Sequence, residues 1–173
     1  MGNTRELTKT QRAATAYHEA GHVVVAWHLF VKVEDISIFP DEDTAGRVQH
    51  ANLILRSGKY PELDDPVRAR LRMEKGVMIT LGGMTAQRQF NPRSVRSFHG
   101  SSDYGVAADI ALHLHAGDEE RANAFLRYVE IETRQVISFR WPWVEVLASA
   151  LLVQNTIKGT AVAQLLDTCV RPR

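Results

Sequence analysis

Apolar positions recur at helical spacing along most of this chain. Thr8 and Gln11 have the spacing of a capping box, which predicts a first helix that runs from there to about Phe30. Apolar residues three and four positions apart predict five more helices, over Pro66 to Phe90, Ser101 or Ser102 to about Ala116, Glu119 to about Phe139, Trp143 to Gln154 and Ala161 to Asp167. The pattern therefore predicts a mostly helical chain.

Two short segments instead alternate apolar and polar positions, which is typical of strands. Val31 to Phe39 alternates in this way and then meets Pro40, a residue that stops a strand. Gly46 to Leu55 is a second extended segment, and we expect the two to pair near the first helix. Segments rich in glycine, proline and charge predict loops between these elements. The predicted fold class is mainly α (α+β), a helical array with a small β-sheet.

The composition limits the classes of protein that this chain can represent. Its 173 residues, 45% hydrophobic and 24% charged, suffice for one full core, so we expect a single domain over residues 1–173. A net charge of +1 predicts no nucleic-acid partner. The sequence shows neither a signal peptide nor a membrane span, and the lone cysteine, Cys169, excludes an internal disulfide framework. We therefore expect a cytoplasmic protein without a membrane span.

The first predicted helix carries an H-E-x-x-H pattern, His18-Glu19-Ala20-Gly21-His22. Histidines four residues apart lie on one face of a helix, where both can bind the same metal ion. Glu19 lies about 100° round from His18, too far to be an equal ligand but placed to reach a water molecule on the metal. Glycine inside a helix costs about 1 kcal/mol relative to alanine, so Gly21 suggests that another segment packs closely there. This is the pattern of a zinc-dependent hydrolase.

A catalytic zinc site normally has three protein ligands, so a third one is needed. His28 has metzincin spacing, but that pattern requires a glycine where this chain has Val25, and a continuous helix carries His28 about 240° round from the metal. We reject His28 for that reason. Glu74 would serve as a downstream glutamate on a helix, and Asp103 lies at a predicted loop-to-helix junction. Spacing alone leaves Glu74 and Asp103 open.

Four segments resemble the peptidase domain of FtsH-type ATP-dependent zinc proteases. They are residues 15–22, the LGG tract at 81–83, HGSSDYGVAADIAL at 99–112 and the C-terminal stretch at 147–166, in the same order as in that family. The resemblance implies a zinc ion (Zn2+) held by His18, His22 and Asp103, with Glu19 as the catalytic base. It therefore favours Asp103 over Glu74.

The chain also departs from that family in two respects. The family has an ATPase module and usually membrane helices upstream, whereas this sequence has no Walker-type phosphate-binding motif. After the LGG tract the family usually has paired glutamates, where this chain has Gln87 and Arg88. The second departure changes the charge next to the predicted ligands and leaves the ligands themselves intact.

The predicted function is hydrolysis of internal peptide bonds in unfolded or extended polypeptides, through a metal-activated water with Glu19 as general base. The predicted substrate contacts are one strand segment and one histidine near Asp103: Gly46, Arg47, Val48, Gln49 and His99. The resemblance also implies a homo-oligomer, a hexamer in that family. Two alternatives are a peptidase subunit that docks on a separate ATPase and a catalytically silent metal-binding regulatory or interaction module. Glu19 argues against the silent module, because a structural metal site needs no general base.

Overall fold

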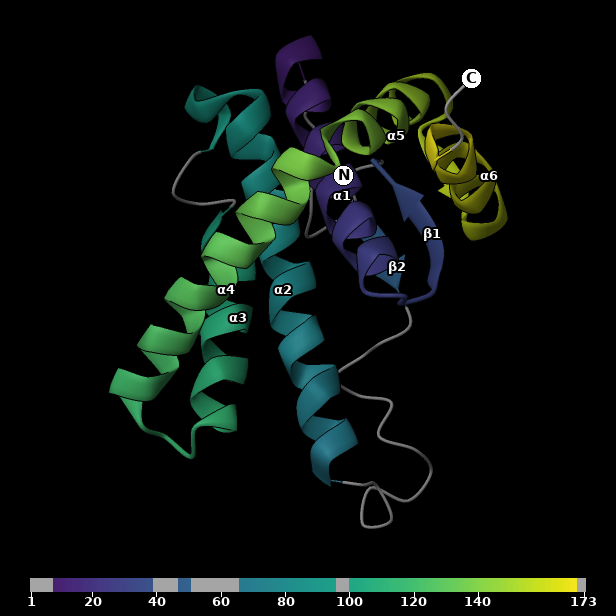
Figure 1. The fold of residues 1–173 in the computed structure, drawn as a ribbon. Coiled ribbons are helices and arrows are strands. Elements are labelled where there is room, and N and C mark those ends of the chain that lie inside the picture. Colours follow the sequence, from purple (N-terminus) through teal and green to yellow (C-terminus); the bar gives the residue numbers. More distant parts are fainter. Residues whose placement is uncertain (1–7, 39–46, 51–65, 96–99, 171–173) are drawn as a thin grey trace, which may run out of the picture.

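The computed structural model describes residues 8–38, 47–50, 66–95 and 100–170 (Figure 1). Within these ranges the elements follow in the order α1 (Lys9–His28), β1 (Val33–Ser37), β2 (Arg47–His50), α2 (Pro66–Phe90), the 3-10 turn η2 (Pro92–Ser94), α3 (Gly100–Leu114), α4 (Glu119–Phe139), α5 (Trp141–Gln154), β3 (Thr156–Lys158) and α6 (Gly159–Val170). The structure confirms the predicted fold class, a helical array with a small β-sheet.

Helix α1 begins at the predicted capping box. The Thr8 side chain accepts a hydrogen bond from the Gln11 backbone N–H at 3.3 Å, and the Gln11 side chain accepts one from the Thr8 N–H at 3.0 Å. Two backbone donors that the first turn leaves unpaired are thereby satisfied. The helix ends at His28, and Phe30 has φ 58°, a left-handed conformation that a helix cannot continue. The H-E-x-x-H motif lies in the middle of α1.

Gly21 marks the point where α1 crosses α2. A β-carbon on Gly21 would lie 2.6 Å from Ala86 Cβ and would clash with the Gly82 carbonyl, and one on Gly82 would lie 2.8 Å from the Gly21 carbonyl oxygen. The two backbones thus approach so closely that only glycine fits at the crossing. The prediction that another segment packs closely over Gly21 is confirmed, and the crossing holds α2 against the motif.

The sheet contains one strand more than the sequence predicts. Its order is β2-β1-β3, and β1 pairs antiparallel with both neighbours. The expected pairing of the two extended segments is confirmed. Strand β1 is shorter than predicted, and the rest of the second predicted segment lies outside the described residues. Strand β3 lies directly before α6, where no strand was predicted. Gly159 opens α6 against the β1 backbone, and a β-carbon there would clash with the Val33 carbonyl oxygen.

Two apolar clusters make up the core of the described residues. One joins α1 to the sheet, α5 and α6, with Val24, Ile36 and Leu147 among its fully buried members. The other joins α2, α3 and α4, with Leu81 among its buried members. In Figure 1, α1 lies between the sheet on one side and α2 with α3 on the other. The motif helix therefore lies at the boundary between the two clusters.

Several helix boundaries differ from the prediction. Helix α3 begins at Gly100, so Ser101 and Ser102 lie inside the helix and not before its first residue as predicted. Residues Pro92–Ser94, expected in a loop, form a 3-10 turn capped by the Asn91 side chain. Helix α6 extends at both ends beyond the predicted residues. Helix ends depend on local capping and tertiary contacts, which apolar spacing does not encode.

Within the described ranges, no single helix is both long and apolar enough to cross a membrane. Helices α4 and α5 meet that criterion only as a pair, and they are bent by 74° at their junction. Arg140 occupies the junction, with its guanidinium 4.2 Å from the centre of the Trp143 ring.

Candidate metal centre

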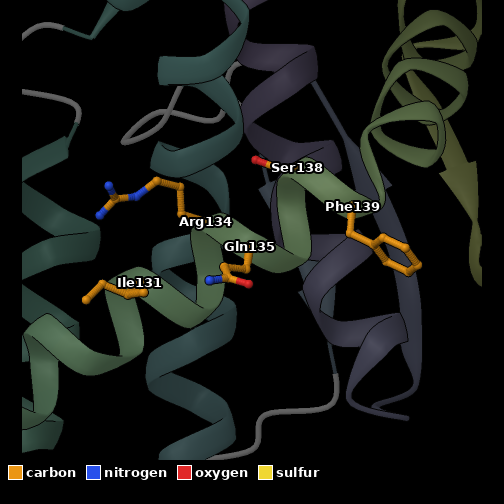
Figure 2. Close-up of a pocket in the computed structure, with 5 residues that line it drawn as sticks. All are labelled: Ile131, Arg134, Gln135, Ser138 and Phe139. Carbon is orange, nitrogen blue, oxygen red and sulfur yellow. The ribbon is translucent and has the colours of Figure 1, made fainter.

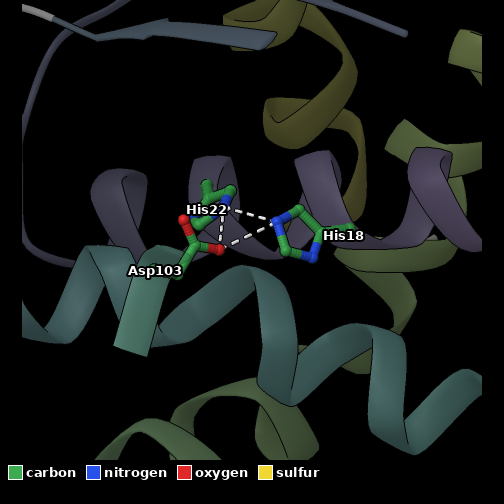
Figure 3. A group of neighbouring side chains, drawn as sticks. All are labelled: His18, His22 and Asp103. Carbon is green, nitrogen blue, oxygen red and sulfur yellow. Dashed lines mark hydrogen bonds and ion pairs between the residues drawn. The ribbon is translucent and has the colours of Figure 1, made fainter. Parts of the chain in front are cut away.

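The structure brings together the three residues that the resemblance nominates as metal ligands. His18 and His22 extend from one face of α1, and Asp103 comes from the first turn of α3 (Figure 3). The two Nε2 atoms are 3.0 Å apart, and Asp103 Oδ2 lies 3.0 Å from His18 Nε2 and 3.5 Å from His22 Nε2. All three potential ligand atoms lie within 4.8 Å of one another. One cation could contact all three.

The hydrogen bonds around this group leave lone pairs pointing inward. His22 Nδ1 lies 2.8 Å from the Ile79 carbonyl oxygen, which can only accept, so Nδ1 carries the proton and Nε2 has the lone pair. Asp103 Oδ2 is buried and contacts the two histidine Nε2 atoms, and it has no further hydrogen-bond partner among the described residues. Two imidazoles and one carboxylate fit a zinc ion.

The charges within the group favour an added cation. Burial opposes ionisation of Asp103, but contacts with His18 and His22 outweigh it and hold the pKa of this carboxyl well below its usual range. Burial likewise opposes protonation of His22, yet Asp103, Glu19 and the Ile79 carbonyl outweigh it and raise the pKa of His22 to about 9. Without a metal the group thus attracts a proton.

Glu19 lies beside this group without belonging to it. It is buried, and among the described residues it is not one of the side chains that converge on the common point. Burial raises the pKa of Glu19, an effect that His22 and His18 partly oppose. This placement agrees with the predicted distinction between two histidine ligands and a nearby base, and the role of Glu19 as a base stays a prediction.

The other candidate ligands lie elsewhere. The Glu74 carboxylate forms an ion pair with Arg70 Nε at 2.9 Å on the surface of α2, and Arg70 lies one helical turn before Glu74. His28 is the last residue of α1 and is partly buried. Burial lowers the pKa of His28, and the positive charge of Arg140 lowers it further. Neither residue joins the His18, His22 and Asp103 group.

The predicted substrate contacts are only partly described. Arg47, Val48 and Gln49 belong to β2, which is an edge strand of the described sheet and contacts α1. Gly46 and His99 lie outside the described residues.

Three residues on one face of α2, none of them predicted as a site residue, contact the two histidines. Ile79, Gly83 and Gln87 are spaced four residues apart and therefore share one helix face. The Ile79 carbonyl contacts His22 Nδ1, Gly83 faces both Nε2 atoms, and Gln87 Oε1 lies 3.0 Å from His18 Nδ1. The four-residue spacing was visible in the sequence, but only the crossing at Gly21 shows that this face meets the motif.

Gly83→Ala is expected to lower zinc affinity at least about tenfold, because the supporting atoms of a metal site tune its affinity to this degree. The new β-carbon would lie 2.8 Å from His18 Nε2 and still closer to His22 Nε2. Hydrogen bonds at both Nδ1 atoms prevent the rings from simply turning away. The measurement is chelator competition for zinc.

The matched control is Gly105→Ala on α3, where an added β-carbon meets nothing within 4 Å. This variant should bind zinc like the parent and gain up to about 1 kcal/mol of helix stability. Equal zinc affinity in all three proteins would show that Gly83 does not shape the site.

One hollow in the described part of the structure lies apart from the histidines. Ile131, Arg134, Gln135, Ser138 and Phe139 line a hollow of about 570 Å³ (Figure 2). All five residues belong to α4, so the hollow is a surface feature of one helix. It contributes no residue to the His18, His22 and Asp103 group.

Fold and site together describe a helical domain with a candidate His–His–Asp metal centre. No protein-family model matches the chain. It is similar to the ATP-dependent zinc metalloprotease FtsH of Rickettsia conorii, at 22% identity over 93% of this chain and 30% of that protein. It is also similar to the ATP-dependent zinc metalloprotease FtsH 1 of Rhodopirellula baltica, at 32% identity over 51% of this chain and 12% of that protein. These matches support a distant relationship to FtsH, and the chain spans less than a third of either relative.

Proposed function

We propose that residues 1–173 form a single zinc-dependent endopeptidase domain of the FtsH type, which hydrolyses internal peptide bonds of unfolded or extended polypeptides. The observation that carries the proposal is the convergence of His18, His22 and Asp103 on one point, where the buried Asp103 Oδ2 has no other hydrogen-bond partner among the described residues. The distant relationship to proteins named zinc metalloproteases supports the same metal and the same class of reaction.

In this proposal, three residues bind the metal and a fourth, Glu19, transfers the proton during hydrolysis. A zinc ion bound to His18, His22 and Asp103 would supply a Lewis acid that polarises the scissile carbonyl and a water molecule. Glu19 takes a proton from the attacking water and delivers it to the departing amine. The C–N bond breaks, the carbonyl carbon gains OH and the nitrogen gains H, so no bond to the protein is needed.

The position of β2 at the edge of the described sheet favours an extended polypeptide as the substrate. It pairs with β1 on one side, and within the described part of the chain its other edge has no strand partner. An extended peptide that adds to such an edge is held by backbone hydrogen bonds, which favours unfolded chains and a weak sequence preference. Arg47, Val48 and Gln49 would make these contacts, together with Gly46 and His99.

The two relatives are named ATP-dependent, whereas the chain contains no Walker-type motif. We infer that an ATPase outside residues 1–173 supplies unfolded substrate, and that the domain assembles as a homo-oligomer, with a hexamer as the form that the resemblance implies. Activity of the chain alone should then be weak and rise when the ATPase is added. Light scattering measures the oligomeric state.

Purified protein is expected to contain about one zinc ion per chain and to cleave casein. Removal of the metal with a chelator should abolish cleavage, and added zinc should restore it, because the reaction needs the Lewis acid. Metal analysis and a casein assay test both points. A preparation that holds zinc but cleaves neither casein nor several unstructured peptides would contradict the peptidase and favour the silent metal-binding module.

A further inference from the structure

Gln87 is a buried polar side chain that contacts both a candidate ligand and a turn outside the metal centre. It is 8% exposed, and it extends from α2 toward α1. Its Oε1 lies 3.0 Å from His18 Nδ1, and its Nε2 donates to the Ser94 carbonyl oxygen at 3.1 Å and to Ser94 Oγ at 3.3 Å. Gln87 therefore links η2 to the first histidine of the motif.

The Ser94 end of this link fixes which way the amide points. The Ser94 carbonyl oxygen can only accept a hydrogen bond, so it requires the NH₂ end of Gln87. The Ser94 hydroxyl donates its own proton to the Asn91 carbonyl oxygen at 2.7 Å, so it too faces Gln87 as an acceptor. A flipped amide would place its oxygen against two acceptors.

The amide orientation in turn fixes the proton on His18. With NH₂ toward Ser94, Oε1 faces His18 and can only accept, so His18 Nδ1 must carry a proton. The His18 lone pair is then on Nε2, which faces His22 and Asp103. We propose that Gln87, held by Ser94, is a positioning residue that selects the metal-binding tautomer and ring orientation of His18.

The turn that holds Ser94 is itself tied to α2. The Ser94 backbone N–H donates to the Asn91 carbonyl at 2.9 Å, and the Asn91 side chain accepts from the Arg93 N–H at 3.1 Å. The Asn91 N–H donates to the Gln87 carbonyl at 2.9 Å, and this hydrogen bond holds the turn against the end of α2. Ser94 is thus a fixed acceptor and its effect reaches His18 through Gln87.

An amide satisfies both ends of this arrangement, because it donates toward Ser94 and accepts from His18. A carboxylate at this position would still accept from His18 Nδ1, but its second oxygen would face the Ser94 carbonyl without a proton between them. The glutamine at this position, where the FtsH-type pattern usually has a glutamate, therefore fits the Ser94 turn.

The test uses zinc and cobalt(II) alone, without a substrate, and compares Gln87→Met, Gln87→Glu and the control Gln89→Met. Gln89 is an exposed residue of the same helix, where it accepts from Ser138 Oγ at 3.3 Å. Gln87→Met should weaken zinc binding about 10- to 100-fold, the usual effect of losing a partner behind a histidine ligand. Gln87→Glu, which retains the acceptor, should recover most of that loss, and Gln89→Met should match the parent.

Two spectroscopic readouts separate positioning from general stability. Imidazole ¹⁵N spectra of the zinc-loaded parent should show a proton on His18 Nδ1, and the visible spectrum of bound cobalt(II) should change in Gln87→Met but not in Gln89→Met. Zinc affinity of Gln87→Met within twofold of the parent, Gln87→Glu as weak as Gln87→Met, or a zinc-bound His18 protonated on Nε2 would each overturn the proposal.

The inference rests on the proposed function only in taking zinc as the cation. A parent that binds zinc with the expected Gln87 dependence but cleaves no polypeptide would contradict the peptidase and leave the role of Gln87 standing. If the parent cleaves casein while Gln87→Met binds zinc normally, the role of Gln87 is contradicted and the peptidase stands. A parent that binds no zinc would overturn both.

Discussion

Replacing Glu19 with glutamine is expected to reduce casein cleavage by about 10²- to 10⁴-fold, the usual contribution of a general base, while zinc content stays near that of the parent. Glutamine keeps the size and a polar end but cannot take a proton from water. Because Glu19 is not one of the three converging side chains, its replacement removes no ligand. Casein cleavage and metal analysis on the same preparation measure the two effects.

The matched control for this experiment is Glu145→Gln. Glu145 is an exposed glutamate of α5, a helix that packs against α1, so this variant makes the same chemical change outside the group of His18, His22 and Asp103. It should cleave casein at the parental rate. Two results would contradict the assigned mechanism: a Glu19→Gln protein as active as the parent, or one that loses its zinc, since the latter would make Glu19 a ligand.

The sequence predicts most helices because their signals are local. The capping box at Thr8 and the apolar spacing of α2 and α4 act within a few residues, and the structure places those three helices where the pattern predicts them. Strand β3 has no such local signal. Its three residues are a strand because Ile157 pairs with Ile36 of β1, more than a hundred positions earlier in the chain. Such long-range pairing is invisible to periodicity.

The candidate site likewise contains some residues that local spacing predicts and one that depends on how the helices pack. The two histidines follow from their four-residue spacing on α1, and the close packing at Gly21 follows from the cost of glycine in a helix. Asp103 does not follow from spacing, because its approach to α1 depends on how α3 packs against α2. The resemblance supplied Asp103, and the structure then placed its carboxylate 3.0 Å from His18 Nε2.

The supporting residues were the hardest to predict from the sequence. Gln87 stood out as a departure from the FtsH-type pattern, but its role depends on two facts of three-dimensional structure. One is the crossing of α1 and α2 at Gly21 and Gly82, which brings the 79-83-87 face against the histidines. The other is the turn that places the Ser94 carbonyl within 3.1 Å of the amide. Neither contact has a signature in residue spacing.

A bound cation would join parts of the molecule that belong to different apolar clusters. His18 and His22 lie on α1, which packs with the sheet and α5, whereas Asp103 lies on α3, which packs with α2 and α4. A ligand that binds only the folded state stabilises it by about 2.7 kcal/mol at a concentration 100 times its Kd. Zinc should therefore stabilise the relative position of α1 and α3.

Asp103→Asn is expected to remove most of this stabilisation. For a chain of this size, 2.7 kcal/mol corresponds to a rise in Tm of roughly 5 to 10 °C, and the variant should show little of it at the same zinc concentration. Asparagine has a similar shape to aspartate, but it lacks the negative charge of a carboxylate ligand. Zinc affinity should therefore fall more than about 100-fold, which exceeds the effect of losing a residue that only supports a ligand.

Thermal unfolding with and without zinc measures this effect, and Asp109→Asn is the control. Asp109 is an exposed aspartate of the same helix, outside the converging group, so its replacement makes the same charge change without removing a ligand. Asp109→Asn should retain the full zinc-induced rise in Tm and the parental casein cleavage. If Asp103→Asn shows the same rise as the parent, Asp103 does not bind the cation. The three-ligand centre would then be wrong, even if His18 and His22 still bind zinc.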